Sequence, residues 1–291
     1  MTYILYNPNA AGGCGEEYAE CLALTVFEAK LIDLSRITNY RVFLAGLNAE
    51  DKIILCGGDG TLHRFANDIQ GIEILQEIYY FAVGSGNDFA RDLGKEKFDD
   101  PDYRIDGYLR RLPTVTVNGQ TRLFLNNVGF GIDGYCCEEG DRRRAENQKR
   151  HKPRPINYTA IAIKGLLMKY KPTDAMVAVD GRLYYFSKVW LAPTMKGRFY
   201  GGGMMAAPAQ DRTGETLTLM VMGGRGRLST LMLFPSIFSG KHVGRKGVTL
   251  LSGKEITVEF DRPTPLQIDG ETFLNVRSYS VTAAIPAEVK A

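Results

Sequence analysis

Three short apolar runs in the first third of the chain each end in a turn rich in Gly, Asn, Asp or Ser, and each turn leads into a helix-like segment. Strands that alternate with helices through short turns are typical of a parallel sheet with helices on both faces. We therefore expect residues 1–113 to form a doubly wound, mostly parallel α/β domain. The expected strands are YILY (3–6), KIILC (52–56) and YYFAV (79–83), and the turns are NPNAAGG (7–13), GGDGTLH (57–63) and GSGND (84–88).

Apolar residues recur at helical spacing in the segments after these turns. The spacing predicts helices over EEYAECLALTVFEAK (16–30), LHRFANDIQGI (62–72) and FARDLG (89–94), the last of which ends at a glycine.

From about residue 114 the pattern changes to short strands joined by two-residue turns. TVTV-NG-QTRLFL (114–125), AMVAV-DG-RLYYF (175–186) and PLQI-DG-ETF (265–273) place Asn-Gly or Asp-Gly between alternating runs, which is typical of β-hairpins. Helices are expected at 156–171 and 227–238, between the strands. We expect residues 114–276 to form a mostly antiparallel β-sandwich, with residues 277–291 either staying in it or returning to the first domain.

The overall composition excludes several classes of protein. With 44% hydrophobic residues and a formal net charge of +3, the chain is neither disordered nor basic enough to indicate nucleic-acid binding. The five cysteines show no C-x-x-C spacing, so we expect reduced thiols. No apolar run approaches the ~18 residues that cross a bilayer, and the first residues do not resemble a leader. We expect a cytoplasmic protein.

The three turns of the first domain indicate a phosphate site. In a doubly wound sheet, strand ends and helix N-termini line one crevice, where free N–H groups favour anions and glycine permits close approach. Any one turn alone is better explained as an ordinary capped loop, whereas three together favour a nucleotide site. The candidate binding residues are Asn7, Asn9, Gly57, Gly58, Asp59, Gly60, Thr61, Gly84, Ser85 and Asn87.

No P-loop, dinucleotide fingerprint or protein-kinase glycine loop is present in the sequence. The nucleotide is therefore expected to be held in another way. Asp59 lies among Gly57, Gly58 and Gly60, close to the expected phosphates. Since two anions repel, we expect Mg²⁺ to bridge them, through water at Asp59. The alternative for these residues is a tight Gly-Asp-Gly hairpin turn.

GGDGTLH (57–63), with NPNAAGG before it and GSGNDFAR (84–91) after it, resembles the catalytic family of diacylglycerol kinases, which includes sphingoid-base and bacterial lipid kinases. The likeness continues through NNVGFGIDG (126–134), the Gly-Lys-His stretch at 240–242 and QIDGE (267–271), and so covers nearly the whole chain. GGDGT alone is shared with NAD kinases and phosphofructokinases. The GSGNDFAR and DGE motifs favour the lipid-kinase branch.

The resemblance implies a first domain like that of NAD kinases and phosphofructokinases, a second β-sandwich domain, and a cleft where ATP meets a lipid hydroxyl. Residues 57–61 would bind the ATP phosphates, and Asp59 would belong to the Mg²⁺ and water network. Ser85 stands where the family usually has threonine, and it keeps the hydroxyl. Ala82 replaces the proline that usually precedes this motif.

The resemblance also implies roles for two acids of the second domain. The glutamate of DGE is the proposed general base of the family, which makes Glu271 the candidate to accept the proton of the acceptor hydroxyl. Local sequence alone fits a solvated residue after a hairpin turn. Family members carry a structural Mg²⁺ in a loop that here reads QDRTGETL (210–217), where Asp211 is the nearest acid but Thr213 replaces an aspartate. The alternative is an exposed loop aspartate.

The expected function is ATP- and Mg²⁺-dependent transfer of the γ-phosphoryl group to diacylglycerol or a related lipid. The alternatives are a kinase of a soluble alcohol such as NAD, and a non-catalytic nucleotide- or lipid-binding protein. The basic run DRRRAENQKRHKPRP (141–155) suggests peripheral contact with an anionic inner membrane surface, or else a solvated helix face. No nucleic-acid partner is expected, and a homodimer is one possible oligomeric state.

Overall fold

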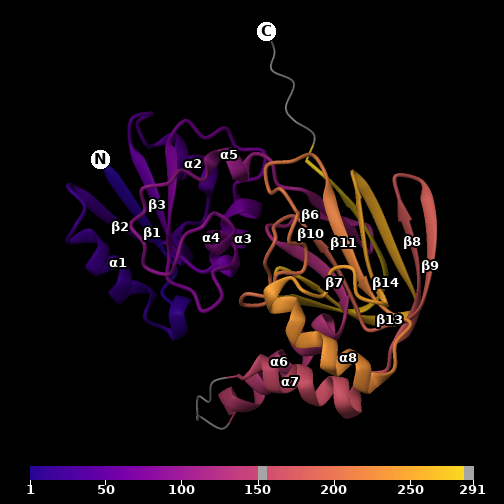
Figure 1. Ribbon diagram of the computed structural model, residues 1–291. Helices are drawn as coiled ribbons and strands as arrows, with labels where there is room; N and C mark the ends of the chain where they lie inside the picture. The colour runs from indigo at the N-terminus through magenta and orange to yellow at the C-terminus, as the bar shows by residue number, and fades with distance from the viewer. Residues whose placement is uncertain (150–155, 285–291) are drawn as a thin grey trace. The chain divides into compact units, whose positions relative to one another are not determined.

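The structure is a computed structural model that describes residues 1–149 and 156–284 (Figure 1). The chain divides into two compact units, Met1–Leu112 and Pro113–Ala291. Among the described residues, no helix combines the length and the apolar character needed to cross a membrane.

The first unit is built on a four-stranded parallel sheet with the strand order β2-β1-β3-β4. Ile4 and Leu5 of β1 are both fully buried. Since successive strand residues point to opposite faces, both faces of the sheet are covered, as the doubly wound expectation requires. The strands are β1 (Thr2–Tyr6), β2 (Ala29–Asp33), β3 (Lys52–Gly57) and β4 (Glu77–Ala82), and the α-helices are α1 (Gly15–Ala23), α2 (Tyr40–Ala45), α3 (Asp59–Asp68), α4 (Asp88–Asp92) and α5 (Asp106–Leu109).

The helix predicted over residues 16–30 is too long. Helix α1 ends at Ala23, and strand β2 begins at Ala29 and pairs in parallel with β1. Between them, Leu24 and Phe27 are 89% and 86% exposed, and Glu28 takes the left-handed backbone conformation with φ 52°. The prediction was wrong here because Leu24 and Phe27 keep helical spacing in the sequence but face solvent instead of a core.

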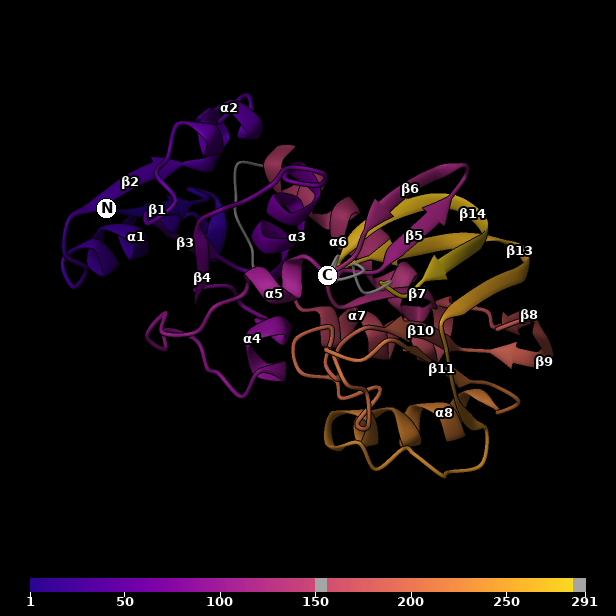
Figure 2. The same ribbon diagram turned by 90° about the horizontal axis from the view of Figure 1, so that it is seen from above.

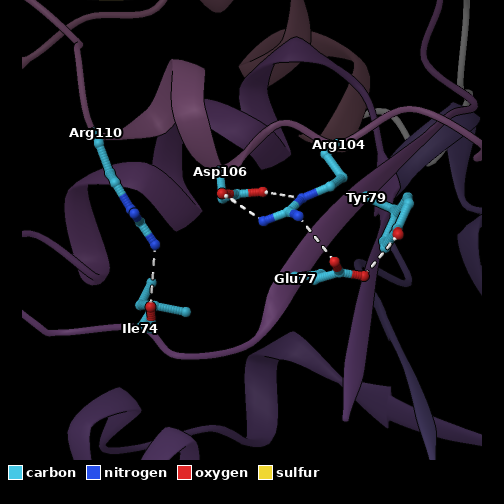
Figure 3. A network of polar contacts seen from close by, with 6 residues as sticks. All are labelled: Ile74, Glu77, Tyr79, Arg104, Asp106 and Arg110. Carbon is cyan, nitrogen blue, oxygen red and sulfur yellow. Dashed lines mark hydrogen bonds and ion pairs between the residues drawn. The ribbon is translucent and has the colours of Figure 1, made fainter. Parts of the chain in front are cut away.

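A polar network covers the edge of the sheet at β4 (Figure 3). Arg104 donates to both carboxylate oxygens of Asp106 at 3.0 and 3.1 Å and to Glu77 at 2.8 Å, and the Tyr79 hydroxyl donates to Glu77 at 2.8 Å. Burial alone would raise the pKa of Asp106, but the hydrogen bonds and charge of Arg104 outweigh it and lower the pKa. The network holds residues 104–106 beside β4, where an open strand edge would otherwise be exposed.

The second unit contains one antiparallel network of ten strands. Its main path runs β12-β11-β10-β7-β13-β14-β5-β6, and β8 and β9 join through β13. The strands are β5 (Thr114–Val117), β6 (Gln120–Leu123), β7 (Asn127–Gly131), β8 (Thr173–Val179), β9 (Arg182–Val189), β10 (Leu191–Met195), β11 (Leu217–Met222), β12 (Val248–Gly253), β13 (Glu255–Ile268) and β14 (Glu271–Thr282).

All three predicted hairpins are confirmed. The turns Asn118-Gly119, Asp180-Gly181 and Asp269-Gly270 have positive φ at both positions, between 46° and 88°, as a type I′ turn requires. Strand β14 pairs with β13 and β5 up to Thr282, so residues 277–282 belong to the second unit. The alternative that the C-terminal residues return to the first domain also covered residues 285–291, which lie outside the described residues.

Strand β13 lets this sheet curl around a core. Residues 256–260 pair with β8, and after two register shifts residues 266–268 pair with β7. The bend encloses a buried cluster in which Phe130 stacks on Phe260 at 4.5 Å between ring centroids and contacts Tyr279 at 5.2 Å. Such register shifts increase local bending, which accounts for the sandwich-like form.

Three α-helices of the second unit lie together on one side of the strands (Figure 1). They are α6 (Ile132–Lys149), α7 (Tyr158–Lys164), which continues into a π-helix (Gly165–Lys169), and α8 (Arg227–Leu233), which continues into a 3-10 helix (Phe234–Ser239). Helix α6 contacts α7, and α8 contacts the π-helix. The predicted helices at 156–171 and 227–238 are thus present with these changes of helical type.

We expect Phe130→Ala to lower the free energy of unfolding of the second unit by about 3–5 kcal/mol, because a stacked, fully buried ring leaves a cavity. Urea denaturation followed by circular dichroism measures the change. Phe27→Ala is the control, since that ring is 86% exposed and should change stability by less than about 0.5 kcal/mol. Equal effects of the two changes would contradict this account of the core.

Candidate functional site

The turns after β3 and β4 approach each other at their glycines. A Cβ atom added to Gly84 would lie 2.7 Å from the Cα of Gly58, and one added to Gly58 would lie 3.0 Å from the Cα of Gly84. The N–H of Val83 also donates to the carbonyl of Gly57 at 2.9 Å. Only glycine fits this backbone contact, so the glycines predicted to approach phosphate serve first to bring two loops together.

Asp59 fastens the same two loops through its carboxylate. It is the first residue of α3, and its two oxygens accept the N–H groups of Asp88 and Phe89, each at 2.9 Å. These N–H groups open helix α4, where no residue within the helix could accept them. The sequence placed Asp59 beside the phosphates and Mg²⁺, and it did not reveal this capping role across 29 residues of chain.

The third turn is joined through Asn7. The amide of Asn7 donates to the hydroxyl of Thr61 at 3.2 Å, and its oxygen accepts the N–H of Asn9 at 3.0 Å. Thr61 lies in the first turn of α3 and is buried. The structure therefore brings all three predicted turns together in the first unit. Asn9 and Ser85 lie at the exposed rim, where neither side chain forms a hydrogen bond with another described residue.

One feature at this place, the exposed start of α3, suits an anionic ligand, and a second, the Asn87 side chain, offers a hydrogen-bond acceptor that suits a donor group or a cation. Gly60 in the first turn of α3 is exposed, and a Cβ there would meet no heavy atom within 4 Å. Asn87, 6% exposed and in the left-handed conformation, donates to the carbonyl of Gly84 at 2.9 Å, while its Oδ1 has no partner among the described residues. The positive end of a ten-residue helix next to bare backbone is a favourable site for phosphate.

Glu271 lies in the second unit, at the first residue of β14. Its carboxylate is half exposed and lies 3.9 Å from Arg122 in a loose ion pair. The turn before it places it, because Asp269 and Gly270 connect β13 to β14. Glu271 thus belongs to the second unit, whereas the three turns of the candidate phosphate site belong to the first.

Asp269 is a residue that the sequence analysis treated only as part of a turn. Its carboxylate accepts the N–H groups of three successive residues, Leu125, Asn126 at 2.7 Å and Asn127 at 3.0 Å. The buried Arg212 binds the same segment, donating to the carbonyl of Leu125 at 2.8 Å and to the Asn126 side chain at 2.7 Å. The sequence offered one signal for this contact. The DGE motif (269–271) and the Asn-Asn pair (126–127) both belong to the motifs shared with the family.

Asp133 is a buried acid that sequence reasoning missed. It is 7% exposed, Oδ1 accepts the hydroxyl of Tyr200 at 3.1 Å, and Oδ2 has no partner among the described residues. Burial raises the pKa of Asp133 to about 8, and the hydrogen bond from Tyr200 opposes the shift. Such a carboxyl is largely protonated at neutral pH.

The second metal site suggested at Asp211 does not fit the structure. Asp211 is exposed, and its Oδ1 accepts both the N–H of Thr213 at 2.8 Å and the Thr213 hydroxyl at 2.7 Å. The carbonyl of Gly214, which could help to hold a cation, accepts the buried ammonium of Lys196 at 2.9 Å. Among the described residues, no group of three or more His, Cys, Asp or Glu side chains could hold a metal.

We expect Lys196→Met to destabilise the second unit by about 1–3 kcal/mol, because it leaves a buried carbonyl without its donor. Lys254→Met is the matched control, since Lys254 contacts the same loop through Glu215 but is exposed. EDTA should not change the melting temperature of the wild type, measured by calorimetry. A fall in melting temperature with EDTA that Mg²⁺ restores would contradict the absence of a metal in this loop.

We expect Asp133 to make stability depend on pH. Its folded pKa of about 8 lies above the unfolded value of 3.8, so its stabilising contribution is complete below about pH 4 and is lost as pH rises toward 8. The slope should reach about 1.4 kcal/mol per pH unit. Urea titrations of wild type and Asp133→Asn between these pH values measure it, and an equal slope in the variant would refute the assignment.

The chain matches two family models. Residues 1–117 match the diacylglycerol kinase catalytic domain, and residues 127–289 match the YegS C-terminal NAD kinase beta sandwich-like domain. Among curated proteins, a diacylglycerol kinase of Mycobacterium tuberculosis is 26% identical over 215 residues, covering 72% of this chain and 67% of the relative. A diacylglycerol kinase of Bacillus subtilis is 25% identical over 233 residues, covering 78% and 73%.

Solved structures show the same fold. The crystal structure of a diacylglycerol kinase from Bacillus anthracis superposes with a TM-score of 0.60 at 16% identity, over 99% of this chain and 98% of that one. The parallel first sheet, the antiparallel second unit and the two matched models agree in their order along the chain. The chain belongs to the diacylglycerol-kinase catalytic family, a family of lipid kinases.

Proposed function

We propose that the protein transfers the γ-phosphoryl group of ATP, in the presence of Mg²⁺, to the hydroxyl of diacylglycerol or a related lipid. The observation that carries the nucleotide half of this proposal is the junction of three turns in the first unit, held by the contacts of Gly58 with Gly84, of Asp59 with α4 and of Asn7 with Thr61. The family likeness supports the lipid half.

The phosphates would lie at the N-terminus of α3. There the exposed Gly60 leaves the backbone open, while the unpartnered Oδ1 of Asn87 is an acceptor for a donor group of the nucleotide rather than for its phosphates. Phosphoryl transfer needs mainly alignment and neutralisation of charge. Since the carboxylate of Asp59 lies in this junction, Asp59 would hold Mg²⁺ through water, and the cation would neutralise phosphate charge there.

Glu271 would accept the proton of the lipid hydroxyl. Its side chain is half exposed, and its contact with Arg122 at 3.9 Å is loose enough for the carboxylate to exchange partners. Asp269, bound to three successive N–H groups, fixes the turn from which Glu271 projects. A base held by a rigid turn is the arrangement that general-base catalysis requires. We place the enzyme at the cytoplasmic side of the membrane that contains its lipid substrate.

We expect Glu271→Gln to lower kcat for lipid phosphorylation by about 10²-fold or more, because the amide cannot accept the proton. Mg-ATP affinity should stay unchanged. Glu255→Gln is the control, since Glu255 is likewise an exposed glutamate that begins a strand. The assay measures ³²P transfer to diacylglycerol, monoacylglycerol, sphingosine and ceramide in mixed micelles, with NAD as a soluble acceptor. Full activity in Glu271→Gln would remove it from the mechanism.

We expect Asp59→Asn to abolish transfer and also to weaken the junction by about 1–2 kcal/mol, since one carboxylate acceptor for α4 is replaced by a donor. Asp68→Asn at the other end of α3 is the matched control. Calorimetry separates the loss of stability from the loss of activity. Phosphorylation of NAD alone would favour a kinase of soluble alcohols, and Mg-ATP binding without any transfer would favour a non-catalytic protein.

A further inference from the structure

Two adjacent helical segments of the second unit contain no acidic residue. These are residues 158–171 and 227–246, which include α7 with its π-helix and α8 with its 3-10 helix; together we call them the acid-free helices. Figure 1 shows them with α6 on one side of the strands, and Figure 2 shows the same elements from above. Their basic residues are Lys164, Lys169, Lys171, Arg227, Lys241, Arg245 and Lys246.

The acid-free helices are held to each other and to the core. Arg227 at the start of α8 donates to the carbonyls of Leu166 at 2.5 Å and Tyr170 at 2.9 Å, and its guanidinium lies 5.2 Å from the ring of Trp190. The inward side chains, Leu166 and Ile237 among them, belong to one buried cluster. The pair is therefore a fixed part of the unit rather than a loose appendage.

Many of the exposed side chains of the pair are apolar. Met168 and Met232 are 66% and 69% exposed, and five further large apolar residues are at least 42% exposed. Those five are Ile163, Leu167, Leu228, Phe238 and Val243. Exposed apolar side chains gathered on adjacent helices mark an interaction surface, because isolated ones are common but a cluster is not.

Among the described residues, the basic side chains of the pair have no acidic partner. Apart from Arg227, all of them are exposed, and no ion pair with another described residue is formed by Lys164, Lys169 or Lys241. Helix α6 beside them provides the contrast. Its Arg142 bonds Glu139 and Glu146, and Arg144 pairs with Asp141, so these arginines of the basic run have acidic partners within the same helix. Residues 150–155 lie outside the described residues.

We infer that the acid-free helices dock on the surface of a bilayer that contains anionic phospholipid. Apolar side chains would enter the headgroup boundary while the lysines meet lipid phosphates, the combination by which interfacial helices bind. A second copy of the chain fits less well, because a symmetric contact would place the same cationic surface against itself. The inference deepens the proposed function, since a lipid acceptor has to be reached in its membrane.

Vesicle flotation tests the docking without using activity. The wild type should bind vesicles of phosphatidylcholine with about 30 mol% phosphatidylglycerol, and binding should fall about tenfold on phosphatidylcholine alone or in about 0.5 M salt. The double variant Met168→Ser with Met232→Ser should bind about tenfold more weakly, as should Lys164→Glu with Lys169→Glu. Leu183→Ser with Tyr185→Ser is the matched control, because these apolar residues are 54% and 74% exposed on strand β9.

Equal binding to the two vesicle types, or unchanged binding by both acid-free-helix variants, would overturn the inference. So would a wild-type dimer in sedimentation velocity that the methionine variant converts to monomer, which would assign the surface to a second copy. Thermal melting checks that the variants fold. Kinase assays with short-chain diacylglycerol in detergent keep the two proposals apart. Vesicle binding without phosphorylation of any lipid would contradict the proposed kinase function and support the docking surface. Kinase activity without vesicle binding would support the proposed function and contradict the docking surface.

Discussion

The two hydrogen bonds from α4 to the carboxylate of Asp59 are the constraint on which the candidate site depends. They join the first turn of α3 to the loop after β4, so the close contact of Gly58 with Gly84 is held from both sides. Hydrogen bonds to a charged acceptor contribute about 1.5–3 kcal/mol each, more than neutral ones. The loop after β4 is thereby held in one conformation by contacts within the first unit.

In the second unit, Asp269 likewise holds a neighbouring loop through hydrogen bonds to its carboxylate. Its carboxylate accepts three successive N–H groups, and Arg212 binds the other side of the same segment. Residues 125–127 therefore lack freedom to move away from the turn that carries Glu271. In each unit an aspartate followed by glycine accepts hydrogen bonds from a neighbouring loop. The GDG and DGE motifs therefore stabilise the structure, whatever chemistry they also perform.

The sequence predicted features that depend on neighbouring residues and missed those that depend on distant ones. The type I′ hairpins follow from dipeptides such as Asp180-Gly181, and the parallel sheet follows from the alternation of strands and helices. Helix α1 was overextended because Phe27 keeps helical spacing while facing solvent. The partners of Asp59 and Asp269 lie 29 and about 143 residues away, and no local pattern encodes such a contact. The burial of Asp133 is likewise a property of the packed unit, not of its neighbours in sequence.

Net charge conceals a division of charge that matters for a lipid kinase. A formal value of +3 over the chain gives no reason to expect an electrostatic partner, because 33 acids nearly balance 36 bases. Yet those acids avoid residues 158–171 and 227–246 entirely, while α6 carries both signs and pairs them within one helix. Surface potential falls off within about 8 Å at physiological salt, so a membrane would respond to this local excess rather than to the total. The distribution of acids, more than the number of bases, is what gives this unit a cationic face.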